Sequence, residues 1–271
     1  MRIALIQMLT TGNRSEDIQT ACSRIRKAAA GGADFAVLPE MFCCPYQDDC
    51  FLPYSEEENG PVQTAFSALA QELGIYIVGG SIPERVGDKL HNTCYVYDRT
   101  GRLLAKHRKM HMFDIDVPGG QRFTESATFT PGDSITTFET EFGTVGLCIC
   151  FDLRFEELFR CMALRGAKVI FVPAAFNMTT GPAHWELTFR MRALDNQCFM
   201  VGVGPARNEQ ASYVAYGNSI VTDPWGSVMA RAGAEETILF ADLDLQRIDA
   251  IRKQIPILSN RRTDIYSISE R

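Results

Sequence analysis

Short apolar runs alternate with longer amphipathic stretches along the whole chain. The runs Ile3–Met8, Asp34–Pro39 and Lys168–Pro173 have the length and apolar content of buried strands. The stretch Pro61–Leu73 has helical spacing, with proline at its first position and Gly74 just past its end. Strands that alternate with helices in this way are typical of an α/β protein.

The same pattern predicts a similar set of elements in each half of the chain. In the first half we expect two helices, Ser15–Ala30 and Pro61–Leu73, and five strands: Ile3–Met8, Asp34–Pro39, Ile75–Ile82, His91–Tyr97 and Arg102–Lys106. In the second half we expect two helices, Arg154–Arg165 and Pro182–Asn196, and five strands: Thr144–Cys150, Lys168–Pro173, Cys198–Val203, Asn218–Thr222 and Val228–Arg231.

Three pairs of segments indicate that the second half repeats the first. GGADFAVLPE (31–40) resembles RGAKVIFVPA (165–174), ELGIYIVGG (72–80) resembles NQCFMVGVG (196–204), and YDRTGRLLAK (97–106) resembles TDPWGSVMAR (222–231). The pairs occur in the same order, which chance does not easily produce. We therefore predict a four-layer α-β-β-α sandwich with an internal pseudo-twofold repeat. No Pro/Gly/Ser-rich linker separates the halves, so a single domain spanning residues 1–271 is expected.

Composition narrows the classes of partner and compartment. The net charge is −6 and the pI about 5.3, which argues against binding to nucleic acid or an anionic membrane. No run of 18 apolar residues is present, and the N-terminal residues lack the features of a signal peptide. The nine cysteines form no CxxC motif, so we expect reduced thiols in a cytoplasmic protein.

The sequence has almost no residues spaced in the way that metal ligands usually are. His107 and His111 are the only close pair among four histidines, and no third ligand lies near them in the sequence. We therefore expect neither a metal nor another cofactor.

Three residues that could carry chemistry lie at the carboxyl ends of predicted strands, where sites gather in α/β sheets. Glu40 follows DFAVLP, Lys109 follows LLAKHR, and Cys150 closes TVGLCIC before a predicted helix. A thiol near a helix N-terminus ionises more readily and is a nucleophile. A buried carboxylate can accept its proton, and an ammonium can stabilise an oxyanion.

Each of these residues taken alone has an ordinary explanation. Glu40 is then a surface or capping residue, Lys109 a solvated lysine, and Cys150, beside Cys148, a small core residue. A papain-like Cys/His pair that uses one of the four distant histidines also remains open on sequence grounds.

The short sequence motifs around Glu40, Lys109 and Cys150 indicate that the three residues act together. VLPE, which ends at Glu40, HRKMH, which contains Lys109, and CICFDLRF, which contains Cys150, resemble the three signature motifs of the nitrilase superfamily. The resemblance covers essentially the whole chain and agrees with the predicted sandwich. It implies that Cys150 is the nucleophile, Glu40 the general base and Lys109 the oxyanion stabiliser. It further implies that Glu125, within RFTESATFTPGDS, orients the lysine and substrate.

The finer resemblance is to the ω-amidase branch of that superfamily. It is carried by PEMFCCPY, FTES, CFDLRF, AFNMTTGPAHWELTFRMRALDNQ, GPARNEQASYVAYGNS and QIPILSNRR. It implies hydrolysis of the terminal amide of 2-oxoglutaramate and 2-oxosuccinamate through a cysteine thioester, and a homodimer. Arg154 is then expected to bind the distal carboxylate of this small-molecule amide, with Tyr46, Phe176 and Thr180 lining the pocket. An arginine fork suits a carboxylate, and the predicted helix N-terminus favours an anion.

Two alternatives stay open at this stage, and a third lacks the sign that it would need. Arg154 could pair with Glu156, Glu157 or Asp152 instead of a substrate. The enzyme could be a sister amidase that acts on deaminated glutathione, an N-carbamoyl compound or another aliphatic amide. A catalytically dead scaffold would require a lost triad residue, and none is lost.

Overall fold

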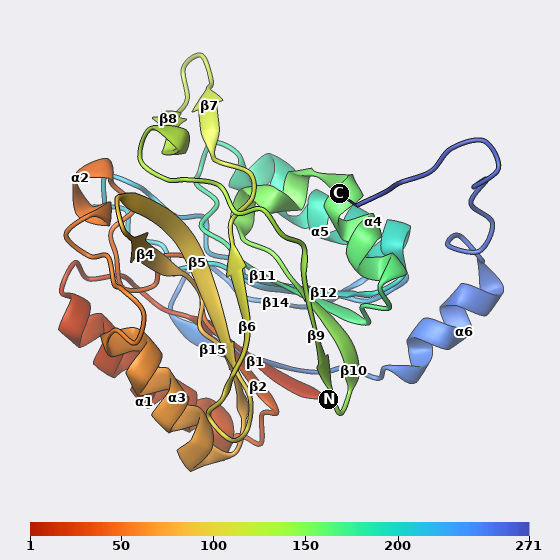
Figure 1. Ribbon diagram of the computed structural model, residues 1–271, viewed down its shortest axis with the longest axis horizontal. Coiled ribbons are helices and arrows are strands. Elements are labelled where there is room, and N and C mark those ends of the chain that lie inside the picture. The colour runs from red at the N-terminus through yellow and green to blue at the C-terminus, as the bar shows by residue number, and fades with distance from the viewer. Residues whose placement is uncertain (271) are drawn as a thin grey trace.

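Two β-sheets pack face to face in the middle of the molecule, and helices cover both outer faces (Figure 1). This computed structural model describes residues 1–270. The first sheet has seven strands in the order β15-β1-β2-β3-β5-β4, with β6 paired to β5. Their bounds are β1 Arg2–Gln7, β2 Phe35–Val37, β3 Tyr76–Val78, β4 Ile82–Val86, β5 Lys89–Tyr97, β6 Leu103–Arg108 and β15 Thr237–Asp242.

The second sheet has six strands in the order β14-β13-β12-β11-β10-β9. Their bounds are β9 Thr136–Thr140, β10 Gly143–Leu147, β11 Val169–Pro173, β12 Phe199–Val203, β13 Ile220–Thr222 and β14 Val228–Arg231. A separate hairpin of β7 (Asp114–Asp116) and β8 (Arg122–Thr124) projects beyond the end of the sheets (Figure 1).

Helices flank the sheets in two pairs. α1 (Arg14–Ala30) and α3 (Pro61–Leu73) lie on the first sheet, and α4 (Glu156–Leu164) and α5 (Gly181–Asn196) lie beside the second (Figure 1). Three short helices, α2 (Asp48–Phe51), η1 (Glu125–Ala127) and η2 (Cys150–Arg154), lie in connections, and α6 (Gln246–Gln254) follows β15. None of the helices in residues 1–270 is long and apolar enough to cross a membrane.

The predicted repeat is confirmed by the strand pairing. β1, β2 and β3 are parallel neighbours, followed by antiparallel β5 and β6. In the second half β10, β11 and β12 are parallel neighbours, followed by antiparallel β13 and β14. Each set is bordered by one more antiparallel strand, β15 beside β1 and β9 beside β10. The sheets and their helices form the predicted four layers.

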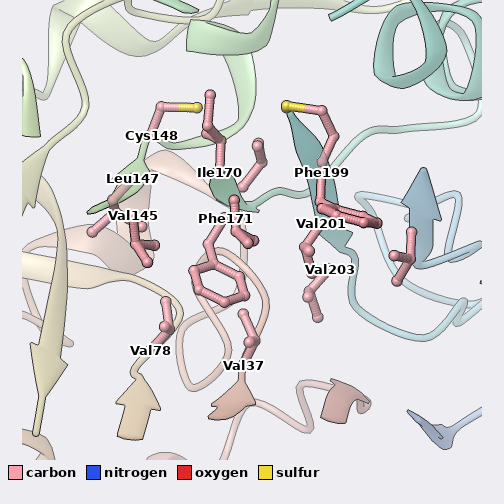
Figure 2. Close-up of a cluster of buried hydrophobic side chains, with 14 of the residues drawn as sticks. Val37, Val78, Val145, Leu147, Cys148, Ile170, Phe171, Phe199, Val201 and Val203 are labelled. Atoms are coloured by element: carbon pink, nitrogen blue, oxygen red, sulfur yellow. The ribbon is translucent and has the colours of Figure 1, made fainter. Parts of the chain in front are cut away.

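The largest apolar cluster joins the two sheets and extends to the helices of the second half. Figure 2 shows Val37 and Val78 of the first sheet facing Phe171 of the second. Phe35 also stacks on Tyr76 and lies 5.2 Å from Phe171, measured between ring centroids. A second cluster fills the space between the first sheet and its helices. The inner face of each sheet is covered by the other sheet, so neither half could bury its apolar surface alone.

Several predicted boundaries are wrong. The run Ile75–Ile82 is not one strand, because Gly79-Gly80 interrupt the extended conformation between β3 and β4. The strand before Cys150 ends at Leu147, and the following α-helix starts at Glu156, not Arg154. The short helix η2 fills the interval. Strands β4, β7, β8, β9 and β15 and helices α2 and α6 were not predicted.

A close backbone approach explains the break at Gly80 and supports Glu40. Gly80 has φ +64°, and a Cβ at this position would lie 2.2 Å from the carbonyl oxygen of Pro39. Only glycine allows this contact without strain. The amide of Ser81 donates to the same carbonyl, and its hydroxyl accepts from the amide of Met41. The peptides on both sides of Glu40 are therefore held by the β3–β4 turn.

A buried carboxylate ties together the three strands that lead to Lys109. Glu84 on β4 accepts from Thr93 on β5 at 2.8 Å, and from Lys106 and Arg108 on β6 at 3.1 and 2.7 Å. Burial alone would raise the pKa of Glu84, but the hydrogen bonds from Arg108, Thr93 and Lys106 outweigh it and lower the pKa to about 2. The ionised form is therefore strongly favoured in the folded protein.

This shift predicts how stability depends on pH. Because the pKa of Glu84 is lowered from 4.5, its contribution is fully present above pH 4.5 and is lost as the pH falls toward 2. Urea unfolding of wild type and Glu84→Gln at pH 7, 4 and 3 measures the effect. The variant should be less stable at pH 7, and the difference from wild type should shrink on acidification. A difference that stays constant across this range would contradict the assignment.

Candidate active site

Four side chains from separate parts of the chain converge at one end of the sandwich. Glu40 follows β2, Lys109 follows β6 directly, Glu125 begins η1 and Cys150 begins η2. Each is at most 5% exposed. The predicted triad residues and Glu125 are therefore brought into one buried cluster.

Lys109 occupies the centre of the cluster. Its Nζ lies 2.9 Å from Glu40 Oε1 and 2.7 Å from Glu125 Oε2, and it donates to the hydroxyl of Tyr46 at 3.4 Å. Burial alone would lower the pKa of Lys109, but the charges of Glu125 and Glu40 outweigh it and raise the pKa. The lysine therefore stays an ammonium within a buried site.

Asn92, on β5, is a member of the cluster that the sequence reasoning missed. Its Nδ2 donates to Glu40 Oε1 at 2.8 Å and to Glu125 Oε1 at 3.2 Å, so one amide bridges both carboxylates. Asn92 lies within HNTCYVY, which has a strand pattern, and no local signal separates it from a solvated asparagine. The one available sign is a polar side chain near the start of the predicted strand His91–Tyr97.

Glu125 is held by groups beyond Lys109. Tyr46 OH donates to Glu125 Oε1 at 3.2 Å, and the backbone amide of Phe113 donates to Glu125 Oε2 at 2.6 Å. With Asn92 these contacts orient the carboxylate toward the ammonium of Lys109.

Cys150 adopts an unusual backbone conformation. Its φ is +46°, which is rare for residues other than glycine and is found disproportionately at functional sites. The backbone amide of Ala175, just after β11, donates to its Sγ at 3.5 Å. The thiol therefore lies beside the amide of Ala175 and close to Glu40.

The thiol of Cys150 and the carboxylate of Glu40 lie close enough that each affects the pKa of the other. Burial raises the pKa of Cys150 and the charge of Glu40 raises it further, whereas the charge of Lys109 and the amide of Ala175 lower it. Burial also raises the pKa of Glu40, opposed by Lys109. Within residues 1–270, Glu40 Oε2 is buried and has no hydrogen-bond partner. This oxygen is free to exchange a proton with the neighbouring thiol.

Arg154, at the end of η2, has no carboxylate partner in the described part of the chain. Its guanidinium lies over the rings of Phe151 and Phe176, 5.4 and 5.1 Å from their centroids, and its Nη1 bonds His184 Nδ1 at 3.2 Å. Burial lowers the pKa of Arg154, and a thiolate at Cys150 would raise it. The pairing with Glu156, Glu157 or Asp152 that the sequence left open does not occur.

The other predicted pocket residues lie near these groups with different roles. Tyr46 contacts both Lys109 and Glu125, as described above, and Phe176 lies beneath Arg154. Thr180 directs its hydroxyl to Asn177 Oδ1 at 3.3 Å, so it is engaged within its own loop before α5.

Tyr213 is a further neighbour that the sequence reasoning did not identify. Its ring lies 4.7 Å from that of Tyr46, and its hydroxyl donates to the carbonyl of Ala175. It therefore supports Ala175, the residue whose amide contacts Cys150. A cavity of about 280 Å³ opens beside Glu40 and is lined by Tyr46, Tyr213 and Ala175 among others. This is near the lower end of the volumes typical of small-molecule sites.

The site offers no cluster of three or more metal-binding side chains among residues 1–270. The His107/His111 pair is committed to Asp152, at 3.1 and 2.8 Å. Likewise, neither histidine contacts Cys150, so the papain-like pair is not formed with them. What the arrangement offers is acid–base and nucleophilic chemistry around a thiol.

Comparison with known proteins agrees with this geometry. Residues 2–253 match the family model described as carbon-nitrogen hydrolase. The chain belongs to the carbon–nitrogen hydrolase family.

Relatives within the carbon–nitrogen hydrolases are close in sequence and fold. The chain is 50% identical to the mouse protein named omega-amidase NIT2, over all of this chain and 98% of the relative. It is 49% identical to human omega-amidase NIT2, over 98% of this chain and 97% of the relative. The crystal structure of Saccharomyces cerevisiae Nit3, a member of branch 10 of the nitrilase superfamily, matches with a TM-score of 0.89 at 38% identity, over 97% and 96% of the two chains.

Proposed function

We propose that this chain is a single-domain ω-amidase, spanning residues 1–271, that hydrolyses the terminal amide of 2-oxoglutaramate and 2-oxosuccinamate. The full-length relatives at about half identity carry the name omega-amidase. The observation that carries the substrate class is the half-buried guanidinium of Arg154, which has no carboxylate partner within residues 1–270 and lies near Cys150. A desolvated cation of this kind favours an anionic ligand group.

The first half of the reaction forms a thioester. Glu40 takes the proton of the Cys150 thiol, and the thiolate sulfur attacks the amide carbon. The carbonyl oxygen then carries a negative charge that the ammonium of Lys109 stabilises, a contribution of roughly 10²–10³ in rate for one such donor. When the C–N bond breaks, Glu40 returns the proton to nitrogen and ammonia leaves.

The second half reverses the roles with water as nucleophile. Glu40 takes a proton from water, and the oxygen attacks the thioester carbon, with Lys109 again at the oxyanion. The C–S bond breaks, Cys150 recovers its proton from Glu40, and the dicarboxylate leaves. Through both halves Glu125 holds Lys109, and Asn92 holds Glu40 and Glu125 by donating to both carboxylates. The reaction needs no metal or cofactor.

The specificity for a distal carboxylate is proposed to come from Arg154. The residue shares the short helix η2 with the nucleophile, and we propose that it binds the end of the substrate that lies away from the reacting amide. Phe151 and Phe176 flank the guanidinium and restrict where its fork can point. Tyr46 and Thr180 are proposed to complete the pocket. The sister amidases, with other substrates, have no observation here that favours them.

Substitution of Arg154 tests the proposed substrate class. A hydrogen bond to a charged group contributes about 1.5–3 kcal/mol, so Arg154→Met should lower kcat/KM on 2-oxoglutaramate by roughly 10–100-fold. Arg154→Lys keeps the charge but loses the planar fork and should also be impaired. On a neutral amide of equal length the loss should be far smaller. Ammonia release from both substrates is the measurement.

Arg160→Met provides the matched control. Arg160 lies on α4 and pairs with Glu156 at 3.2 Å. Its replacement should change kcat/KM on the two substrates by equal, small factors. If Arg154→Met lowers both substrates equally, Arg154 supports the fold and the assignment of a distal carboxylate fails.

We also infer that the protein is a cytoplasmic homodimer, as the sequence predicts. Support for a partner comes from Leu187, Met191 and Leu194, which share one face of α5 and are each at least 40% exposed. Trp225, exposed to 49%, adds to the apolar surface of the second half. Exposed apolar side chains grouped in this way commonly mark association sites. Sedimentation velocity is the measurement that decides between dimer and monomer.

A further inference from the structure

The carboxylate of Asp152 connects the two segments that carry Cys150 and Lys109. Asp152 is fully buried and lies two residues after Cys150, within η2. The catalytic steps proposed above do not use it. Its carboxylate instead faces the segment 107–111, which has Lys109 at its centre.

Both oxygens of Asp152 are fully engaged. Oδ2 accepts from the amide of Ile149 at 3.0 Å and from His107 Nε2 at 3.1 Å. Oδ1 accepts from Nδ1 and the amide of His111 at 2.8 and 2.9 Å, and from the amide of Met110 at 3.2 Å. One donor belongs to the nucleophile's segment, and four belong to the lysine's segment.

The carboxylate requires both histidines to act as donors. An ionised carboxylate only accepts, so His107 Nε2 and His111 Nδ1 both carry hydrogen, which a neutral imidazole can provide. His107 Nδ1 lies 2.9 Å from Thr136 Oγ1, and His111 stacks on Phe155 with ring centroids 3.6 Å apart. Burial alone would raise the pKa of Asp152, but the hydrogen bonds from His107 and His111 outweigh it and hold the pKa well below its ordinary value.

These contacts cross between the two sheets. Lys109 follows β6 of the first sheet, whereas Cys150 follows β10 of the second. The hydrogen bonds within the first sheet position only the segment that carries Lys109, and those within the second sheet position only the segment that carries Cys150. Asp152 bonds both segments within two residues of each reacting group, where a shift of 1 Å can cost about 100-fold in rate.

We propose that Asp152 is a positioning residue that sets the separation between the Cys150 thiol and the Lys109 ammonium, with His107 and His111 as its donors. For turnover this inference rests on the proposed amidase function. The predicted effect on the reactivity of the thiol does not rest on that function, because the charge of Lys109 lowers the pKa of Cys150 whatever the substrate. The two consequences can therefore be measured separately.

Asp152→Asn is the principal test. The amide keeps the size of the carboxylate, but its NH2 group would face N–H donors, so at least one segment is released. We expect kcat to fall by about 100-fold per folded active site while KM stays within about threefold, since Arg154 is untouched. The rate of Cys150 alkylation by iodoacetamide should also shift to higher pH, because a more distant ammonium stabilises the thiolate less.

Asp223→Asn is the matched control. Asp223 is also buried and accepts from the amides of Trp225 and Ser227, but it lies in the turn between β13 and β14. Its replacement should lower the thermal stability and leave both the KM and the alkylation profile of the folded protein unchanged. If Asp152→Asn behaves in the same way as Asp223→Asn, with activity lost only in proportion to unfolded protein, the proposal is overturned.

Two substitutions of His111 keep the test open if Asp152→Asn does not fold. His111→Asn retains a donor near the position of Nδ1 but loses the stack on Phe155, whereas His111→Phe retains the stack and loses the donor. We expect His111→Asn to keep the higher kcat and the more nearly wild-type alkylation profile, and equal behaviour of the two would overturn the proposal. If wild type releases no ammonia from 2-oxoglutaramate, the proposed function fails, while the alkylation comparison still decides the role of Asp152.

Discussion

Cys150→Ala should lower kcat on 2-oxoglutaramate by at least about 10⁴-fold, because no other group in the site can form the acyl-enzyme. The fold should survive, since the buried thiol is replaced by a small apolar side chain. Ammonia release under saturating substrate measures the loss. Rapid quenching of the wild type with substrate should add the mass of the acyl group to the peptide that contains Cys150.

The neighbouring thiol supplies the control for this prediction. Cys148 is also buried and lies two residues before Cys150, but it is packed in the apolar core. Cys148→Ala should keep kcat within a few-fold of wild type. Acyl mass found on Cys148, or Cys150→Ala that retains more than a few per cent of the activity, would remove Cys150 from the role of nucleophile.

Glu40→Gln should lower kcat/KM by roughly 10²–10⁴-fold, the usual range for loss of a general base. The amide preserves size and can still accept from Lys109 and Asn92, but it cannot take the thiol proton. In the wild type, burial raises the pKa of Glu40 above its ordinary 4.5. Because the base must be ionised, activity should fall on the acid side at a pH above 4.5. The pH profile of kcat/KM measures this limb.

Glu56→Gln is the matched control for Glu40. Glu56 is another buried glutamate, which accepts from the amide of Val62 in the first turn of α3 and pairs with Arg14. Its replacement should reduce the free energy of unfolding and leave the pH profile of kcat/KM unchanged. If Glu40→Gln retains activity within about tenfold of wild type, or an unchanged acid limb, a different group must accept the thiol proton.

The comparison of pattern with structure shows where local sequence is informative. Helix α3 matches its predicted bounds, because proline at its start and glycine past its end act within one turn of the backbone. The prediction of one strand at Ile75–Ile82 was wrong. The interruption follows from the close approach of Gly80 to Pro39, a residue that is distant in the sequence. Strand β15 was missed since it pairs with β1 across the whole chain.

The candidate site divides in the same way. Glu40, Lys109 and Cys150 were identified because each stands in a recognisable segment near the end of a strand. Asn92 and Tyr213 were not, because their roles depend only on contacts with residues far along the chain. Arg154 likewise has no carboxylate partner within residues 1–270, and the sequence could not show this. Glu156, Glu157 and Asp152 are all near Arg154 in the sequence, so a pairing with one of them was plausible.

Sequence patterns alone were enough to predict the alternation of strands and helices, the internal repeat and the residue types available for a thiol-based reaction. These depend on side-chain periodicity and on short motifs, which act locally. The three-dimensional structure was needed to show that Lys109 lies between Glu40 and Glu125, and that Asp152 binds the segment around Lys109. All of these contacts join segments that are far apart in the sequence, and burial and charge at such contacts depend on packing that no single segment specifies.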